Sequence, residues 1–174
     1  THGVPSTTNA HPHTSDNVSI VHNGIIENYS LLKKELLKKG YNFKSQTDSE
    51  VIAHLLSDQL KNHNAEVAIK MTMSKLEGAF AIAIIFKDLR LLAGARKGSP
   101  LAVGVSDDAT FIGSDSVALA PFTKKIIYLE EGDSVFIQDK ELKIYNERFN
   151  EVKRQITYSS YNKDNFGKGN FNHF

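Results

Sequence analysis

An uninterrupted apolar run, Ala79–Phe86 (AFAIAIIF), sets the layering of the fold. The run is much shorter than the roughly 20 residues that a membrane span needs, and it has the length of a strand. A strand with apolar residues on both of its faces is typical of a sheet that is covered on both sides. The run therefore predicts a central strand in a sandwich of layers.

Helical periodicity precedes this run. The segment from Tyr29 to Gly40 has apolar residues at helical spacing and closes with two lysines and a glycine, a typical helix end. In Thr47-Asp48-Ser49-Glu50, Thr47 as the N-cap and Glu50 three residues later match a capping box, which predicts that a second helix begins here. A third helix is expected over residues 65–76.

Short β-branched or apolar segments bounded by Gly, Asp or Pro make up much of the remaining sequence. One strand is expected at Val18–His22, after a loop over residues 1–17. The later strands are expected at Leu91–Ala95, Leu101–Val105, Thr110–Gly113, Ile126–Leu129, Ser134–Gln138 and Leu142–Tyr145, with a short helical turn at Ser116–Ala120. Helices grouped together and followed by a run of strands indicate an α+β fold with antiparallel sheets, because parallel βαβ units would alternate the two.

The composition argues against several classes of function. Lys and Arg number 21 and Asp and Glu 20, so a net charge of +1 gives no electrostatic basis for binding nucleic acid or an anionic membrane. The absence of cysteine excludes a disulfide framework and a thiolate metal site, and it favours a cytoplasmic location only slightly. The first residues have neither the basic nor the apolar region of a signal peptide. A soluble domain with one sizeable core is expected from 174 residues.

The pair Asn23-Gly24, at the end of an expected strand, is the first candidate for chemistry. The Asn23 side-chain amide and the Gly24 backbone N–H are two hydrogen-bond donors, and a glycine lets a ligand approach the backbone closely. Two donors aimed at one point stabilise the oxyanion of acyl transfer. The structural alternative is a tight turn, for which Asn-Gly is a common signal.

Asp48 has two interpretations as well. A carboxylate in the first turn of a helix favours the positive end of the helix dipole, and this structural role alone accounts for the residue. The functional alternative is an acceptor for the ammonium group of a ligand.

Other polar residues carry weaker signals. His11 and His13 flank a proline in a loop without nearby cysteines, a poor ligand set, so no metal site is expected. His54 and His63 are expected on helix surfaces. An N-terminal Thr1 has the chemistry of a nucleophile, but the polar loop around it gives no rigid seat, and this role is rejected.

Several motifs, in one order, resemble a known family. They are Thr1-His2-Gly3, Asn9–His13, His22–Asn28, Thr47–Val51, Gly78-Ala79-Phe80, Ala95–Leu101, Ser114-Asp115, Leu129–Asp133, Glu151–Gln155 and the tail Lys168–Phe174. Together they span essentially the whole chain. The sequence is similar to the glutaminase domains, of the N-terminal-nucleophile or class II amidotransferase type, of glutamine–fructose-6-phosphate aminotransferases, also called glucosamine-6-phosphate synthases.

The resemblance implies an αββα sandwich of two antiparallel sheets between helix layers, here truncated at its N-terminus. Residues 1–157 would form the amidotransferase domain and residues 158–174 a linker toward an absent sugar-isomerase domain. In the family an N-terminal Cys attacks the carboxamide of L-glutamine, water hydrolyses the thioester, and ammonia passes to fructose 6-phosphate on the isomerase domain. The resemblance implies no cofactor, and the parent protein is expected to be a homo-oligomer.

Roles for particular residues follow from the resemblance. Asn23 and Gly24 match the oxyanion hole, Thr1 and His2 match a loop that closes over glutamine, and Asp48 matches the acceptor for its α-ammonium group. The sequence departs from the family in having no Cys and in lacking the Arg and Trp that precede the position of Thr1. We therefore expect residues 1–174 alone to bind glutamine weakly and to hydrolyse none.

Two alternatives stay open on the sequence. One is the glutaminase domain of another class II enzyme, such as an amidophosphoribosyltransferase or an asparagine synthetase, although residues 25–28 and 129–133 favour the synthase. The other is a non-catalytic domain of the same fold. The absence of cysteine supports this second alternative, whereas the presence of Asn23, Gly24 and Asp48 argues against it.

Overall fold

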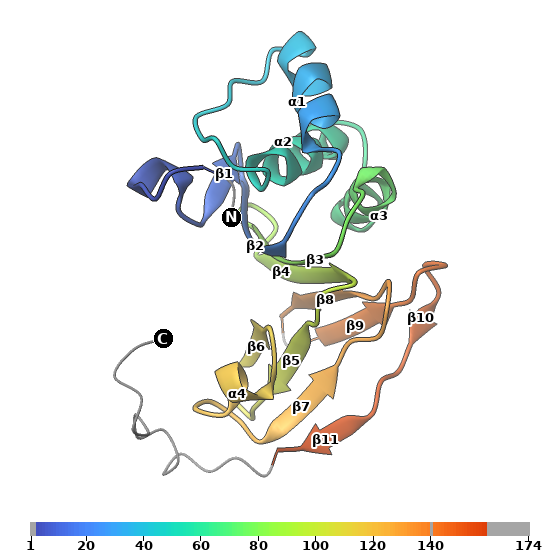
Figure 1. Cartoon of the computed structure of the whole chain (residues 1–174). Helices are drawn as coiled ribbons and strands as arrows, with labels where there is room; N and C mark the ends of the chain where they lie inside the picture. The colour runs from blue at the N-terminus through green and yellow to red at the C-terminus, as the bar shows by residue number, and fades with distance from the viewer. Residues whose placement is uncertain (1–2, 140, 160–174) are drawn as a thin grey trace.

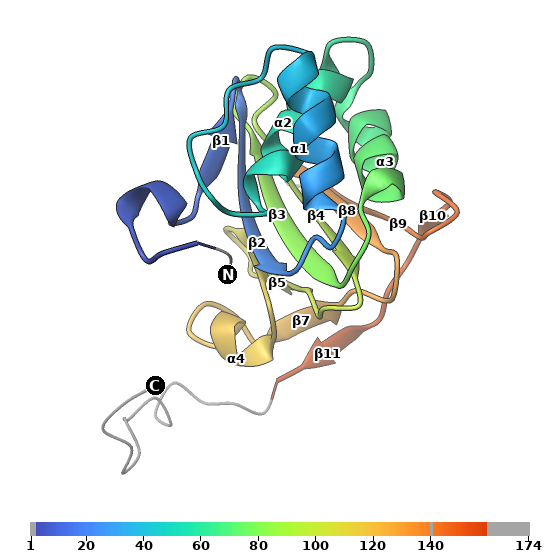
Figure 2. The ribbon, with the colours of Figure 1, turned by 45° about the horizontal axis from the view of Figure 1, so that its top comes forward.

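Two antiparallel sheets pack face to face, and helices cover the outer face of the larger one (Figures 1 and 2). The computed structural model describes residues 3–139 and 141–159. The larger sheet has the strand order β1-β2-β3-β4-β8-β9-β10, and the smaller has the order β11-β7-β5-β6. The expected sandwich of two antiparallel sheets is confirmed.

The elements have the following bounds. The helices are α1 (Tyr29–Lys38), α2 (Glu50–Leu60), α3 (Ala65–Lys75) and α4 (Ser116–Leu119), with a 3₁₀ turn at Thr7–Asn9. The strands are β1 (His13–Ser15), β2 (Val18–Gly24), β3 (Phe80–Phe86), β4 (Leu91–Lys97), β5 (Ala102–Val105), β6 (Thr110–Gly113), β7 (Lys125–Tyr128), β8 (Ser134–Gln138), β9 (Glu141–Tyr145), β10 (Glu151–Val152) and β11 (Ile156–Tyr158). None of the helices in the described ranges combines the length and the hydrophobicity that crossing a bilayer requires.

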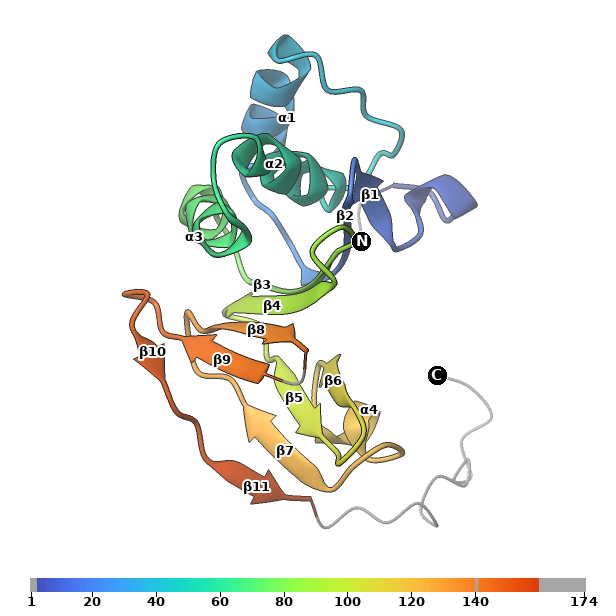
Figure 3. The same ribbon diagram turned by 180° about the vertical axis from the view of Figure 1, so that it is seen from behind.

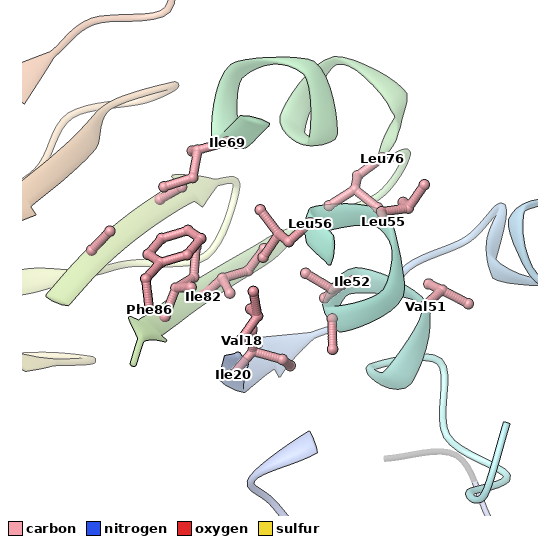
Figure 4. Packing of buried hydrophobic residues seen from close by; sticks show 14 of the residues in the cluster. Val18, Ile20, Val51, Ile52, Leu55, Leu56, Ile69, Leu76, Ile82 and Phe86 are labelled. Carbon is pink, nitrogen blue, oxygen red and sulfur yellow. The ribbon is translucent and has the colours of Figure 1, made fainter. Parts of the chain in front are cut away.

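Strand β3 is central in the larger sheet, between β2 and β4, as the apolar run predicts. Its large side chains, such as Ile82 and Phe86, lie under the helices and pack against residues of α2 and α3 (Figure 4). Its opposite face is only partly covered, because Ala81 is buried against the second sheet whereas Ile85 is 55% exposed. Burial on both faces therefore holds for one end of the strand and not for the other.

The expected loop over residues 1–17 is wrong at His13–Ser15, which form β1. These residues pair with β2 in the register His13↔Ile20, and the side chains of His13 and Ser15 are buried. Two polar residues on the buried face gave no apolar alternation, so the sequence held no strand signal here.

The start of α2 differs from the expected capping box. Helix α2 begins at Glu50, and the side chain of its N-cap, Ser49, makes no capping hydrogen bond. The Glu50 carboxylate accepts hydrogen bonds from the backbone N–H groups of Lys44 and Ser45, at 2.8 and 2.7 Å. The preceding loop folds back over the start of the helix, and its backbone binds the Glu50 carboxylate. In a capping box this carboxylate would bind the backbone N–H of the N-cap residue. Asp48 consequently lies before the helix and not in its first turn.

The larger sheet covers one face of the second sheet, and α4 covers part of the other. Val103 and Ile127 pack toward the larger sheet, and Ala102 and Ile126 pack with Leu119 of α4 on the outer face. Strand β11 continues this sheet as far as Tyr158, which pairs with Lys125. Residues 160–174 lie outside the described part of the chain, so the linker over residues 158–174 stays a prediction.

Candidate functional site

Asn23 and Gly24 are the last two residues of β2. They pair with Ala81 and Phe80 of β3, so the strand runs through both positions and the tight-turn alternative is wrong. Gly24 has φ = +125°, and a Cβ added to it would lie 2.1 Å from the carbonyl oxygen of Ala79. Neither the dihedral angle nor the space admits a side chain, which explains why this position requires glycine.

The backbone N–H of Gly24 points away from β3. The N–H of Ile25 donates to the Ala79 oxygen at 2.9 Å, and the N–H of Glu27 donates to the Glu77 oxygen at 2.9 Å. In an antiparallel ladder every second residue bonds to a given neighbour, so the N–H groups of Gly24 and Ile26 face the opposite edge of β2. Strand β1 covers that edge only from Val18 to Ile20. The Gly24 donor therefore lies on an edge that β1 does not pair.

The side chain of Asn23 projects from the face of β2 that is turned away from the helices, because the buried residues of β2 alternate with it. Beside it is a hollow of about 190 Å³, which lies between the two sheets and is lined by Val21 and Asn23 of β2, Ala81 of β3 and Ile112 of β6. Asn23 thus borders this hollow between the sheets.

Asp48 lies on the same edge of β2 as the Gly24 donor. Its Oδ2 accepts a hydrogen bond from the Ile26 N–H at 2.8 Å, and its side chain is almost fully buried, with 1% of the residue exposed. Ile26 is two residues beyond Gly24, and two residues of extended strand advance roughly 7 Å. A carboxylate and a backbone donor therefore face one edge at a separation of that order.

Three histidines surround the segment that contains Asp48: His13 and His22 are buried, whereas His11 is exposed. The Nδ1 atom of His22 lies 2.9 Å from Ser49 Oγ, the Nε2 atom of His11 lies 3.4 Å from the same oxygen, and His13 Nε2 lies 3.1 Å from Thr47 Oγ1. Burial lowers the pKa of all three rings, and that of His22 falls to about 4. Sequence reasoning considered His11 and His13 only as weak metal ligands and missed this arrangement, because the contacts cross from β1 and β2 to the start of α2.

His54 is another correction. The sequence placed it on a helix surface, but it is buried against the rings of Tyr41 and Phe43, and its Nδ1 atom lies 2.9 Å from Ser15 Oγ. The partner serine belongs to β1, the strand that the sequence did not reveal. His63 is exposed as expected, but it lies in the turn between α2 and α3 and not on a helix.

The loop that joins β4 of the larger sheet to β5 of the smaller sheet packs against the end of β2. A Cβ at Gly98, where φ is +76°, would lie 2.6 Å from the Cβ of Ala79, the residue that also touches Gly24. The Gly98 N–H donates to the Glu131 carboxylate at 2.8 Å, and Arg96 Nη2 donates to it at 3.1 Å. Glu131 thus fixes the loop that packs against the back of the candidate donor.

Thr1 and His2 lie outside the described residues, so their assignment to a glutamine-closing loop remains a prediction. Within residues 3–139 and 141–159, no group of three or more His, Cys, Asp or Glu side chains is arranged to hold a metal ion.

Sequence comparisons connect this geometry to known proteins. A model of the glutamine amidotransferase domain matches residues 4–121. The chain is 50% identical to the glutamine–fructose-6-phosphate aminotransferase (isomerizing) of Mesorhizobium japonicum and 47% identical to that of Zymomonas mobilis. Each comparison covers the whole chain and 29% of the relative, so the chain spans less than a third of the length of these relatives.

Solved structures share the fold. The glutamine phosphoribosylpyrophosphate amidotransferase from B. subtilis, complexed with ADP and GMP, gives a TM-score of 0.71 at 28% identity, over 84% of this chain and 33% of that one. A glutamine aminotransferase class-II domain protein from Silicibacter pomeroyi gives a TM-score of 0.59 at 17% identity, over 81% of this chain and 71% of that one. The sandwich of Figure 3 is thus the one that class II glutamine amidotransferases adopt. With the family model matching more than half of its residues, the chain belongs to the glutamine amidotransferase domain family.

Proposed function

We propose that this chain is the glutamine-hydrolysing domain of a glucosamine-6-phosphate synthase, which releases ammonia from L-glutamine for transfer to fructose 6-phosphate. The name of the relatives at 50% and 47% identity supports this proposal. An amidophosphoribosyltransferase is the weaker alternative, because the likeness to that enzyme is structural and has 28% identity. Fructose 6-phosphate would bind to a sugar-isomerase domain outside residues 1–174.

The observation that carries the proposal is the pairing of donor and carboxylate on one edge of β2. The Gly24 N–H and the Asp48 carboxylate face that edge roughly 7 Å apart. In extended glutamine the carboxamide carbon and the α-nitrogen are separated by four bonds, or about 5 Å. With a hydrogen bond of about 3 Å added at each end, the straight span is about 11 Å, so one glutamine molecule reaches both groups only when its hydrogen bonds leave it at an angle. Asp48 would hold the α-ammonium group, and Gly24 with Asn23 would face the carboxamide.

The chemistry then follows from the two donors. A cysteine thiolate attacks the carboxamide carbon, and the carbonyl oxygen becomes an oxyanion that the Asn23 amide and the Gly24 N–H stabilise. The C–N bond breaks as the nitrogen takes up the proton that the thiol gave up, ammonia leaves, and water hydrolyses the thioester to glutamate and a free thiol. Because the sequence has no cysteine, the thiol would come from a segment outside residues 1–174. The hollow beside Asn23 offers an approach for that segment.

Access to Asp48 sets a further requirement. Asp48 is 1% exposed, so its carboxylate is closed off from solvent. The proposal therefore requires the residues that cover Asp48 to move before glutamine binds. Active sites that close over a substrate exclude water from the reaction in the same way.

Glutaminase kinetics of the full-length protein test the proposal. We expect the wild-type protein to release glutamate from glutamine and to form glucosamine 6-phosphate when fructose 6-phosphate is added. Asn23→Ala is expected to lower kcat by roughly 10²–10³, the usual cost of one oxyanion donor. Residues 1–174 alone are expected to release no glutamate and serve as the blank. A wild-type protein without glutaminase activity would instead support a non-catalytic domain.

A further inference from the structure

A buried hydrogen bond joins the two parts of the candidate site. His22 immediately precedes Asn23 on β2, and Ser49 immediately follows Asp48 before α2. His22 Nδ1 and Ser49 Oγ lie 2.9 Å apart, and both residues are buried. The bond from the Ile26 N–H to Asp48 Oδ2, at 2.8 Å, is the second connection between the same two segments. Strand β2 and the start of α2 are therefore linked at two points, one on each side of Gly24 in the sequence.

The direction of the His22–Ser49 bond follows from the burial of the ring. Burial lowers the pKa of His22 to about 4, so the ring is neutral at pH 7 and carries one N–H. Its Nε2 atom is buried and has no hydrogen-bond partner among residues 3–139 and 141–159. A buried N–H without a partner is rarer than a buried acceptor without one, so the proton belongs on Nδ1. Nδ1–H then donates to Ser49 Oγ, whose own proton can point to His11 Nε2 at 3.4 Å.

A second histidine–serine bond in the molecule provides a matched reference. His54 Nδ1 lies 2.9 Å from Ser15 Oγ, both residues are buried, and His54 Nε2 lies 3.5 Å from Glu50 Oε1. This pair joins α2 to β1, and neither residue neighbours Asn23, Gly24 or Asp48 in the sequence. Loss of either pair removes one buried histidine–serine hydrogen bond. A difference in kinetics between the two variants therefore depends on where the bond lies.

We propose that His22 and Ser49 are positioning residues, which hold the Asp48 carboxylate at the distance from the Gly24 N–H that one glutamine molecule spans. This inference rests on the proposed function. Asp48 is held directly by the Ile26 N–H, and its backbone is held through the neighbouring Ser49. Without the serine hydroxyl, the segment before α2 loses one of the two connections described above, and the bond from the Ile26 N–H to Asp48 remains. The carboxylate then moves relative to the donor, and the α-ammonium group loses its fixed contact.

Steady-state kinetics of the full-length protein with two substrates test the inference. One substrate is glutamine, and the other is 4-carbamoylbutanoate, the same molecule without its α-amino group. Ser49→Ala and His22→Leu are expected to raise the KM for glutamine about tenfold and to change kcat less than threefold, because the α-ammonium contact persists in both ground and transition states. For the analogue, kcat/KM is expected to change less than threefold, because the analogue has no group for Asp48 to bind.

Three control variants make the result specific. His22→Asn keeps an N–H near the position of Nδ1 and is expected to restore at least part of the glutamine KM. Ser15→Ala removes the matched bond from the core and is expected to leave the KM unchanged. Asp48→Asn is expected to raise the KM for glutamine more than Ser49→Ala does, and more than it raises the KM for the analogue.

Each outcome has one meaning. Equal losses with both substrates, or an equal rise in KM for Ser15→Ala, would show that the bond only stabilises the fold, and the inference would be wrong. If Asp48→Asn shows the substrate-dependent loss and Ser49→Ala does not, the inference fails while the proposed function stands. If the wild-type protein hydrolyses neither substrate, the proposed function fails and the inference fails with it.

Discussion

At the scale of single residues, Gly24 shows how much of the site depends on backbone geometry. The Asn-Gly pair is visible in the sequence, but its two interpretations differ only in whether the chain reverses there. The pairing of Gly24 with Phe80 decides between them, and this contact joins residues that are 56 positions apart. Sequence alone therefore singled out the Asn-Gly pair and left its geometry open.

Substitution of Gly24 should be costly for a reason that is independent of catalysis. Gly24→Ala places a Cβ 2.1 Å from the Ala79 oxygen at φ = +125°, and we expect a loss of more than ~3 kcal/mol in the free energy of unfolding. Gly40→Ala is the control, because Gly40 also has a positive φ but has no atom within 4 Å of the added Cβ. We expect it to cost about 1 kcal/mol. Similar losses in urea denaturation for the two variants would contradict the contact at Ala79.

The buried His22 ring makes stability depend on pH. Its pKa is about 4 in the folded chain and near 6.5 in the unfolded chain, so the unfolded state binds more protons between these values. The contribution of His22 is fully present above pH 6.5, falls as the pH decreases, and is lost by about pH 4. The shift corresponds to roughly 3 kcal/mol.

Thermal unfolding between pH 4 and pH 7 measures this dependence. Burial also lowers the pKa values of His11, His13 and His54, so we expect the wild-type Tm to fall steeply in this range. His22→Leu should reduce the slope without abolishing it. An unchanged slope would mean that His22 is protonated in the folded protein.

At the scale of elements, the spacing of apolar residues predicted the helices and strands whose ends depend on neighbouring residues in the sequence. Helix α1 was found with its end at Lys38, and β6 was found with both of its ends, because apolar spacing and glycines mark them. Strand β1 was missed because its buried residues, His13 and Ser15, are polar and are satisfied by Thr47 and His54. These partners lie 34 and 39 residues away, beyond any local pattern.

The capping box failed for a similar reason, and Glu50 has a different role that can be measured. Burial raises the pKa of Glu50, but hydrogen bonds from Lys44 and Ser45 outweigh this effect and leave its pKa below the usual value. Glu50→Gln should weaken these bonds and cost about 1–3 kcal/mol of stability at pH 7. The exposed Glu35 on α1 is the control, and Glu35→Gln should change stability by less than about 0.5 kcal/mol. Equal values for both variants in urea denaturation would refute the role of Glu50.

At the scale of the whole molecule, ion pairs connect the C-terminal strands to the loop behind the site. The fully buried Asp133 accepts two hydrogen bonds from Arg154 at 2.8 Å each, and Arg154 also pairs with Glu130 at 2.9 Å. The adjacent Glu131 holds Gly98, which packs against Ala79 and so supports Gly24. Arg154, which lies between β10 and β11, thus helps to hold the loop that supports the candidate donor.

Removal of the Asp133 charge should destabilise the whole domain. Asp133→Asn leaves Arg154 without its bidentate partner, and we expect a loss of about 3–5 kcal/mol. Asp107, which is exposed and 3.5 Å from Lys125, is the comparison, and Asp107→Asn should cost less than about 1 kcal/mol. Calorimetry of the two variants separates them, and a small loss at Asp133 would show that the C-terminal strands hold without this pair.

At this scale the proposed function rests on one claim. The two ends of a glutamine molecule contact Asp48 and the Asn23-Gly24 pair on a single edge of β2. A crystal structure of the full-length protein with bound glutamine, its nucleophilic cysteine replaced by alanine, tests this claim most directly. We predict that the α-ammonium nitrogen lies within about 3.2 Å of the Asp48 carboxylate and that the carboxamide oxygen is directed toward Gly24 N and Asn23 Nδ2. Glutamine bound elsewhere, or bound here with Asp48 still closed off from its ammonium group, would contradict the account.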